Sequence, residues 1–199
     1  FGPMDLANSL RGDELFTDFA LDPQGVHKLM GFCTRALVWW YPRLLNWADE
    51  VEGGHIFMYT GSWMGPRGLG HITNDAAMLC SPAIYDEFAF PYERMLCEGY
   101  NFVLYHVHNQ KLHFAPRAAH LPNLALLEIT NDPNTPPALE DLPRVLAAAG
   151  SANLMLRGSS DQVRAHIHEL TGRNVFLDIT CADRQDAADI IAVVRAAGK

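Results

Sequence analysis

The stretch Phe102–His108 reads FVLYHVH and decides how the fold is interpreted. It is apolar without strict alternation of polar residues, which is typical of a strand covered on both faces. Four more runs share this character: His55–Thr60, Leu124–Ile129, Asn153–Leu156 and Val175–Ile179. Helical patterns lie before and between these runs and after the last, at Pro23–Glu50, Ser81–Glu98, Ala138–Ala149, Ser160–Leu170 and Arg184–Ala197.

Strands that alternate with helices predict parallel strand–helix–strand units and an α/β fold. The five units expected here are too few for a closed eight-stranded barrel, which takes about 250 residues. They would fit a doubly wound sheet, but the sequence contains neither the GxGxxG motif of dinucleotide-binding proteins nor the GxxxxGK[ST] motif of P-loop proteins. We expect one domain over residues 1–199, with its chemistry at the carboxyl ends of the strands.

The composition argues against several classes of protein. Hydrophobic residues make up 49% of the 199 residues and charged residues 19%, so the chain is not disordered. The net charge of −8 speaks against nucleic-acid binding, and no apolar run approaches the roughly 20 residues that cross a membrane. The four cysteines are scattered without a CxxC pair, which indicates free thiols in a reducing cytoplasm.

Two histidines lie at the end of the FVLYHVH strand. Side chains at positions i and i+2 of a strand point to the same face, so His106 and His108 can converge on one point. His166 and His168 have the same spacing, but they lie on an expected helix, where the two directions differ by about 200°. We therefore expect a site at the first pair and a solvated helix face at the second.

Two further candidate ligands follow later strands. Glu128 lies in an apolar run where an unpaired carboxylate is costly to bury, and Cys181 comes just after Val175–Ile179. Two imidazoles, a carboxylate and a thiolate form a ligand set suited to four-coordinate zinc. The structural alternative is that the histidines form hydrogen bonds in a core, that Glu128 pairs with an arginine, and that Cys181 is a buried apolar residue.

Two blocks of the sequence resemble the uroporphyrinogen decarboxylase superfamily, which also contains zinc-dependent methyltransferases that move methyl groups between corrinoids and thiols. The more specific block is similar to the signature "D…LSP…Y..F..PY" and consists of Asp75, Leu79-Cys80-Ser81-Pro82, Tyr85, Phe88 and Pro91-Tyr92. The other block resembles "GP…L…G…DP…V" and consists of Gly2-Pro3, Leu10, Gly12, Asp22-Pro23 and Val26. His106-Val107-His108-Asn109 falls where the family has "HxCGN".

The resemblance implies a TIM-type (β/α)8 barrel, of which this chain would carry about five βα units and lack about the first three strands. In the methyltransferase branch, zinc is bound by a His-x-Cys pair, a glutamate one βα unit later and a cysteine near the C-terminus. His106, Glu128 and Cys181 match these positions, and His108 replaces the cysteine of the pair. The decarboxylase branch needs no metal and relies on an arginine-rich N-terminal motif that this sequence does not contain.

The activity that the resemblance implies is zinc-dependent methyl transfer between a corrinoid and a thiol. Zinc deprotonates a thiol that binds to it, and the incoming thiol could displace Glu128 from the metal. Glu128 and Asp75 are the expected catalytic residues. Trp63 is a candidate for cofactor binding, with a purely structural role as its alternative, and Asn109 is a candidate for orienting a ligand imidazole.

Two other functions stay open. One is a metal-free carboxy-lyase acting on a tetrapyrrole, and the other is a non-catalytic relative that binds a corrinoid or another ligand. The expected partners are a small-molecule thiol or a tetrapyrrole, together with a corrinoid protein, but neither nucleic acid nor a membrane. Assembly into a homodimer also stays open.

Overall fold

The computed structural model describes residues 1–57, 62–66 and 68–198. Its centre is a parallel five-stranded sheet in the order β3 (Gly68–Ile72), β4 (Phe102–His108), β5 (Leu124–Thr130), β6 (Leu154–Ser159) and β7 (Val175–Thr180). Because the strand order follows the chain order, right-handed connections place the helices on one face, as in the wall of a barrel. The expected parallel α/β architecture is confirmed. In the described part of the chain the sheet stays open, with β3 and β7 as its outer strands.

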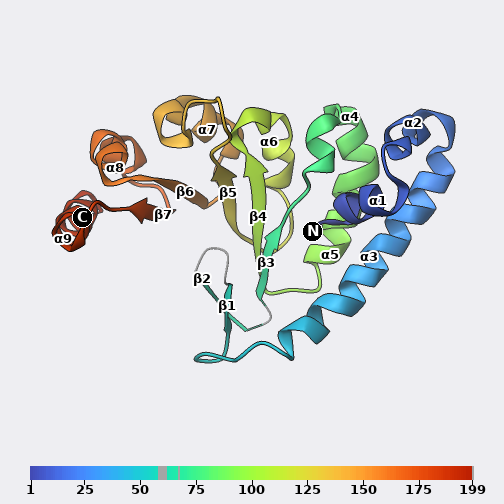
Figure 1. Cartoon of the computed structure of the whole chain (residues 1–199), viewed down its shortest axis with the longest axis horizontal. Helices are drawn as coiled ribbons and strands as arrows, with labels where there is room; N and C mark the ends of the chain where they lie inside the picture. The colour runs from blue at the N-terminus through green and yellow to red at the C-terminus, as the bar shows by residue number, and fades with distance from the viewer. Residues whose placement is uncertain (58–61, 67, 199) are drawn as a thin grey trace.

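Helical segments follow each strand of this sheet (Figure 1). After β3 come η1 (Ala76–Leu79), α4 (Pro82–Ile84), the π-helical turn η2 (Tyr85–Ala89) and α5 (Phe90–Cys97). After β4 come η3 (Asn109–Phe114) and α6 (Ala115–Ala118), and after β5 come η4 (Ala138–Asp141) and α7 (Leu142–Ala149). After β6 come α8 (Ser160–His166) and η5 (Ile167–Leu170), and α9 (Arg184–Ala197) follows β7.

The strand expected at His55–Thr60 does not join the parallel sheet. Its first part, β1 (His55–Phe57), pairs antiparallel with β2 (Ser62–Met64), and residues 58–60 lie outside the described residues. The first parallel strand is Gly68–Ile72, and its two glycines, a residue type depleted in strands, hid it from the sequence pattern. The outer strand of the sheet on this side is therefore β3, and the expected strand at His55–Thr60 is not part of this sheet.

The helix expected over residues 81–98 is interrupted by η2. Pro91 has no N–H to donate to the carbonyl four residues earlier, and a wider turn accommodates the missing bond. Ser81 caps the start of this segment by accepting a hydrogen bond from the Ile84 N–H at 3.3 Å. Within this segment the Tyr85 hydroxyl donates a hydrogen bond to the buried carboxylate of Glu93 at 2.6 Å.

Three helices precede the hairpin, namely α1 (Pro3–Arg11), α2 (Glu14–Leu21) and α3 (Pro23–Leu45), and they lie on the β3 side of the sheet (Figure 1). Helix α3 ends at Leu45 rather than at the expected Glu50, soon after Pro42. It packs mainly against α1, α2 and α5. None of the helices in the described residues is both long and apolar enough to cross a membrane.

The two faces of β4 have different surroundings. Val103, Tyr105 and Val107 are fully buried on the face that the helices cover. Side chains alternate along a strand, so Leu104, His106 and His108 lie on the other face, called the inner face below. Leu104 packs there against Met155 and Leu126. These apolar side chains form a floor, and the histidines stand nearer the carboxyl end of the strand.

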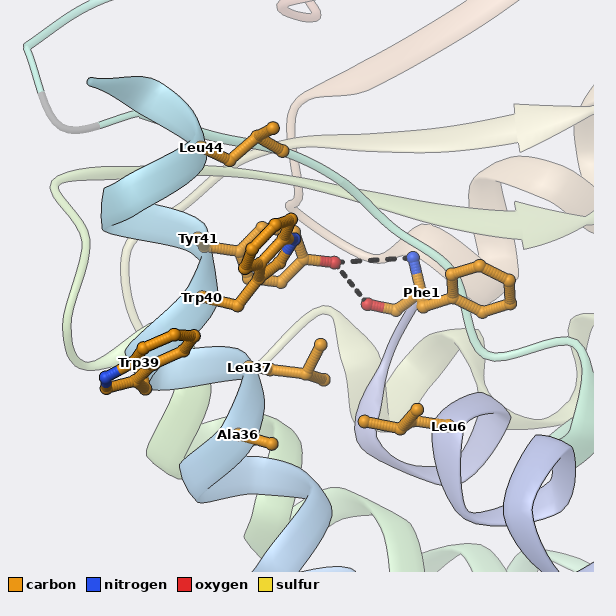
Figure 2. A pocket seen from close by; sticks show the side chains of 8 residues that line it. All are labelled: Phe1, Leu6, Ala36, Leu37, Trp39, Trp40, Tyr41 and Leu44. Carbon is orange, nitrogen blue, oxygen red and sulfur yellow. Dashed lines mark hydrogen bonds between the residues drawn. The ribbon is translucent and has the colours of Figure 1, made fainter. Parts of the chain in front are cut away.

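A cavity of about 500 Å³ lies away from the strand ends, between α1 and α3 (Figure 2). Apolar and aromatic side chains dominate its lining, which consists of Phe1, Leu6, Ala36, Leu37, Trp39, Trp40, Tyr41 and Leu44. The Tyr41 hydroxyl donates to the Phe1 carbonyl at 2.6 Å across it. The cavity is therefore built by the N-terminal helices and is separate from the inner face of the sheet.

Asp186 connects the start of α9 to α8 and offers a test of this packing. Its carboxylate accepts hydrogen bonds from the Ser160 hydroxyl at 2.6 Å and from the Ala182 N–H at 2.9 Å, and it pairs with Arg164 at 2.6 Å. These partners, Ser160 first among them, lower the pKa of Asp186 to about 2. The carboxylate therefore stabilises the fold above its unfolded pKa, and this contribution is lost as the pH falls through the folded pKa.

We predict that Asp186→Asn lowers the Tm at pH 7 and that the difference from the parent chain shrinks as the pH falls from about 4 to about 2. Thermal melts of both proteins across this pH range provide the measurement. A Tm difference that is as large at pH 2 as at pH 7 would show that the ionised carboxylate is not the stabilising group.

Candidate metal centre

His106 and His108 lie together on the inner face at the end of β4. Their Nε2 atoms are 3.2 Å apart, and their rings meet edge to face at a centroid distance of 4.8 Å. His106 is buried, whereas His108 is partly exposed. The i, i+2 spacing on a strand thus places both imidazoles at one point that solvent can reach.

A carboxylate lies behind the Nδ1 atom of each imidazole. His106 Nδ1 is 2.8 Å from Glu128 Oε2, and His108 Nδ1 forms a hydrogen bond with Asp132 Oδ1. An ionised carboxylate can only accept, so each Nδ1 carries a proton, which leaves the Nε2 of each ring as the atom that can bind a further proton or a metal ion. Metal-binding histidines have the same carboxylate–histidine arrangement, which fixes their tautomer and their orientation.

Asp75 adds an oxygen donor to the two nitrogens. Its Oδ1 lies 3.3 Å from His108 Nε2, and the ligand atoms of Asp75, His106 and His108 all lie within 4.8 Å of one another. Two ligand atoms bound to a tetrahedral zinc ion at about 2.0–2.1 Å are themselves about 3.4 Å apart. The observed separations of 3.2 and 3.3 Å therefore suit such an ion.

The charges around His108 favour a cation at this point. The hydrogen bond with Asp75, supported by Asp132 and opposed by burial, raises the pKa of His108 to about 9. His108 in turn lowers the pKa of Asp75 through the same hydrogen bond. Two carboxylates thus attract positive charge to the space between the imidazoles, whether it arrives as a proton or as a metal ion.

Glu128 is completely buried and has nitrogen partners on both oxygens. Its Oε2 lies 2.8 Å from His106 Nδ1 and 3.3 Å from His71 Nε2, and its Oε1 lies 2.9 Å from Arg157 Nη2. Burial raises the pKa of Glu128, but the hydrogen bonds from His106 and His71 and the charge of Arg157 outweigh burial and bring it to about 2. An arginine partner is what the structural interpretation of this residue predicted.

His71 is a third imidazole at the site, and the sequence analysis missed it. With His106 and Glu128 it forms a second set of ligand atoms that lie within 4.8 Å of one another. Its backbone has a φ of 57°, and the pairing register of β3 shifts between Leu69 and Ile72. A bulge of this kind redirects a side chain, and an uncommon φ at a non-glycine residue is often found at functional sites.

The sequence analysis also missed Asp132 and Arg157. Asp132 lies in the loop that follows β5, where its second oxygen accepts a hydrogen bond from the Gln110 N–H at 2.9 Å. Arg157 ends the apolar run of β6 and also pairs with Asp178 Oδ2 at 3.2 Å. Position was the available signal, since each is a charged residue that comes after an apolar run of a strand.

Two other predicted site residues, Cys181 and Trp63, form local contacts of their own. Cys181 follows β7, its Sγ is 3.8 Å from the Ile179 carbonyl, and it belongs to neither set of close ligand atoms in the described residues. Trp63 is half exposed on β2 and donates its Nε1–H to the Val51 carbonyl at 2.8 Å. Both residues are thus engaged locally. Nothing here tests the expected zinc ligation by Cys181, and the site proposed below does without it.

Asn109 acts on the site through Asp132. It is fully buried, and its Oδ1 accepts hydrogen bonds from the Asp132 N–H at 3.1 Å and from the Thr135 hydroxyl at 3.0 Å. Its Nδ2 donates to the Pro136 carbonyl at 2.8 Å. Asn109 therefore holds the loop that contains Asp132, and the Asp132 carboxylate orients His108. The sequence analysis expected Asn109 to contact a ligand imidazole directly.

No protein-family model matches the chain, and no curated protein matches it. The resemblance to the uroporphyrinogen decarboxylase superfamily therefore rests on the two sequence blocks, and membership stays a prediction. The more specific block begins with Asp75, which lies at the histidine pair, and it continues through the Ser81 cap and the π-helical turn to Pro91 at the start of α5.

Arg157 offers a test of the buried charges. We predict that Arg157→Met destabilises the fold by about 3 kcal/mol, because it leaves the buried Glu128 carboxylate without its guanidinium partner. Arg144→Met is the matched control, since it removes the exposed pair with Asp141 and should cost less than about 1 kcal/mol. Urea denaturation measures both losses. Equal losses would contradict the account, and adding Glu128→Gln to Arg157→Met should recover part of the lost stability.

Proposed function

We propose that the chain is a zinc-dependent methyltransferase that moves a methyl group between a corrinoid and a thiol, with its zinc site at the end of β4. The main observation in support of the metal site is that the Nε2 atoms of His106 and His108 face each other at 3.2 Å. Carboxylates of Glu128 and Asp132 stand behind them. The methyl and corrinoid chemistry is supported by the resemblance, above all by the block that begins at Asp75.

In this proposal His106 and His108 hold the ion through Nε2, and Asp75 holds it through Oδ1. Three protein ligands and one open position are the pattern of catalytic zinc, and the partial exposure of Asp75 and His108 leaves room for a fourth ligand. When bound, zinc would hold a substrate thiol as its thiolate at neutral pH. Glu128 and Asp132 keep the protons on the Nδ1 atoms and so maintain the ligand tautomer.

This ligand set differs from the one that the resemblance implies. Glu128 becomes a partner of His106 rather than a ligand, because His106, His71 and Arg157 already contact its oxygens. Two neutral imidazoles and one carboxylate donate less charge to zinc than thiolates do. The ion would therefore be more Lewis acidic, which favours deprotonation of the thiol.

We predict that the purified chain, loaded with zinc and dialysed, retains about one zinc per chain, as expected for a single tetrahedral site. His106→Ala and His108→Ala should each lose this zinc. The matched control is His166→Ala/His168→Ala, which removes two histidines of the same spacing from α8 and η5 and should retain it. Elemental analysis by mass spectrometry provides the measurement, and equal zinc loss in the control would contradict the site.

Methyl transfer itself is tested with methylcobalamin and a small thiol. The methyl group leaves cobalt for sulfur, so a thioether forms and cob(I)alamin remains, which absorbance follows under anaerobic conditions. We predict transfer by the zinc-loaded parent chain and by the α8 and η5 control, but not by His108→Ala. Zinc binding without transfer would favour the ligand-binding alternative, and the absence of zinc would favour the metal-free carboxy-lyase.

A further inference from the structure

The short segment Thr73–Ala76, called the Asp75 segment here, runs from the end of β3 to the first residue of η1 and carries the proposed oxygen ligand. Two buried carboxylates from different helices bind it. Asp5 of α1 accepts hydrogen bonds from the Thr73 hydroxyl at 2.6 Å and from the Ala76 N–H at 3.0 Å. Glu93 of α5 accepts one from Asn74 Nδ2. The segment is thus held on both sides of Asp75.

Burying these two carboxylates costs desolvation free energy, which their hydrogen bonds must offset. Asp5 is only 6% exposed and Glu93 is completely buried. Burial, aided by the charge of Asp5, raises the pKa of Glu93 to about 7. Apolar side chains at these positions would avoid the desolvation cost. Among the described hydrogen bonds, both that the Asp5 carboxylate accepts come from the Asp75 segment.

Glu93 also connects the segment to the strand that carries the histidines. Tyr105 of β4 donates its hydroxyl to Glu93 Oε1 at 2.8 Å, the same oxygen that Asn74 contacts. Tyr105 is the neighbour of His106 in sequence, and Asn74 is the neighbour of Asp75. One buried oxygen therefore links the residues next to two of the three proposed ligands.

We propose that Asp5 and Glu93 are positioning residues that clamp the Asp75 segment and so set the distance from Asp75 to the two histidines. The inference rests on the proposed metal site. The Asp75 side chain itself is 60% exposed, so its own packing does not fix it. The clamp fixes the backbone instead, which limits the positions that the Asp75 carboxylate can take relative to β4.

Two pairs of variants of the full chain distinguish the effect of losing the clamp from the effect of a general loss of stability. Asp5→Ala removes both bonds to the segment, whereas Asp5→Asn keeps an acceptor for the Ala76 N–H and a donor for the Thr73 hydroxyl, which can also accept. Asn74→Ala breaks the bond to Glu93, whereas Tyr85→Phe removes a different donor from the same carboxylate. Each pair thus contrasts loss of the clamp with a matched change that preserves it.

Cobalt(II) titration, followed by its d–d absorbance, reports metal affinity. We expect Asp5→Ala and Asn74→Ala to bind cobalt about 10–100-fold more weakly than the parent chain, the usual cost of removing a group that orients a ligand. Asp5→Asn and Tyr85→Phe should bind it as the parent does. Parent-like binding by Asp5→Ala and Asn74→Ala would overturn the clamp, and so would an equal loss in Tyr85→Phe.

Hydrogen exchange of residues 73–79 tests the clamp without any metal. Exchange there should be faster in Asp5→Ala and Asn74→Ala than in the parent chain, Asp5→Asn and Tyr85→Phe. Unchanged exchange would overturn the clamp. A parent chain that binds no cobalt, together with faster exchange in these two variants, would refute the metal site while supporting the clamp.

Discussion

The hydrogen bond between His106 Nδ1 and the buried carboxylate of Glu128 is the interaction on which the rest of the site depends. It fixes the ring so that Nε2 faces His108, and it requires a charged group in the middle of a parallel sheet. Arg157 of the neighbouring strand β6 compensates that charge, and His71 of β3 contacts the same carboxylate. The environment of one imidazole therefore depends on side chains from three other strands.

The fold brings these groups together through strand register and alternation. His106 lies opposite Glu128 in the β4–β5 ladder, so the imidazole and the carboxylate meet without any loop between them. Alternation sends Tyr105 to the opposite face, where it contacts Glu93 beneath the helices. The two faces of β4 thus have different roles: the inner face carries the two histidines, and the other face carries Tyr105, which supports the Asp75 segment through Glu93.

Much of this arrangement could be predicted from local patterns, and the rest depends on contacts between strands. Four of the five parallel strands have apolar runs, and the i, i+2 spacing placed His106 and His108 on one face. The first strand was misplaced because glycines conceal Gly68–Ile72, and His71 was lost with it. Pairs such as Glu128–Arg157 and His108–Asp132 depend on register and loop path, which no local pattern encodes.

The central claim is a zinc site made of nitrogen and oxygen donors at the end of β4. X-ray absorption at the zinc edge of the loaded chain tests it most directly, because it distinguishes nitrogen or oxygen neighbours from sulfur. The account predicts neighbours at about 2.0–2.1 Å with the scattering pattern of two imidazoles and no sulfur. A sulfur neighbour at about 2.3 Å would contradict it, because it would make Cys181 or another cysteine a ligand in place of the arrangement described.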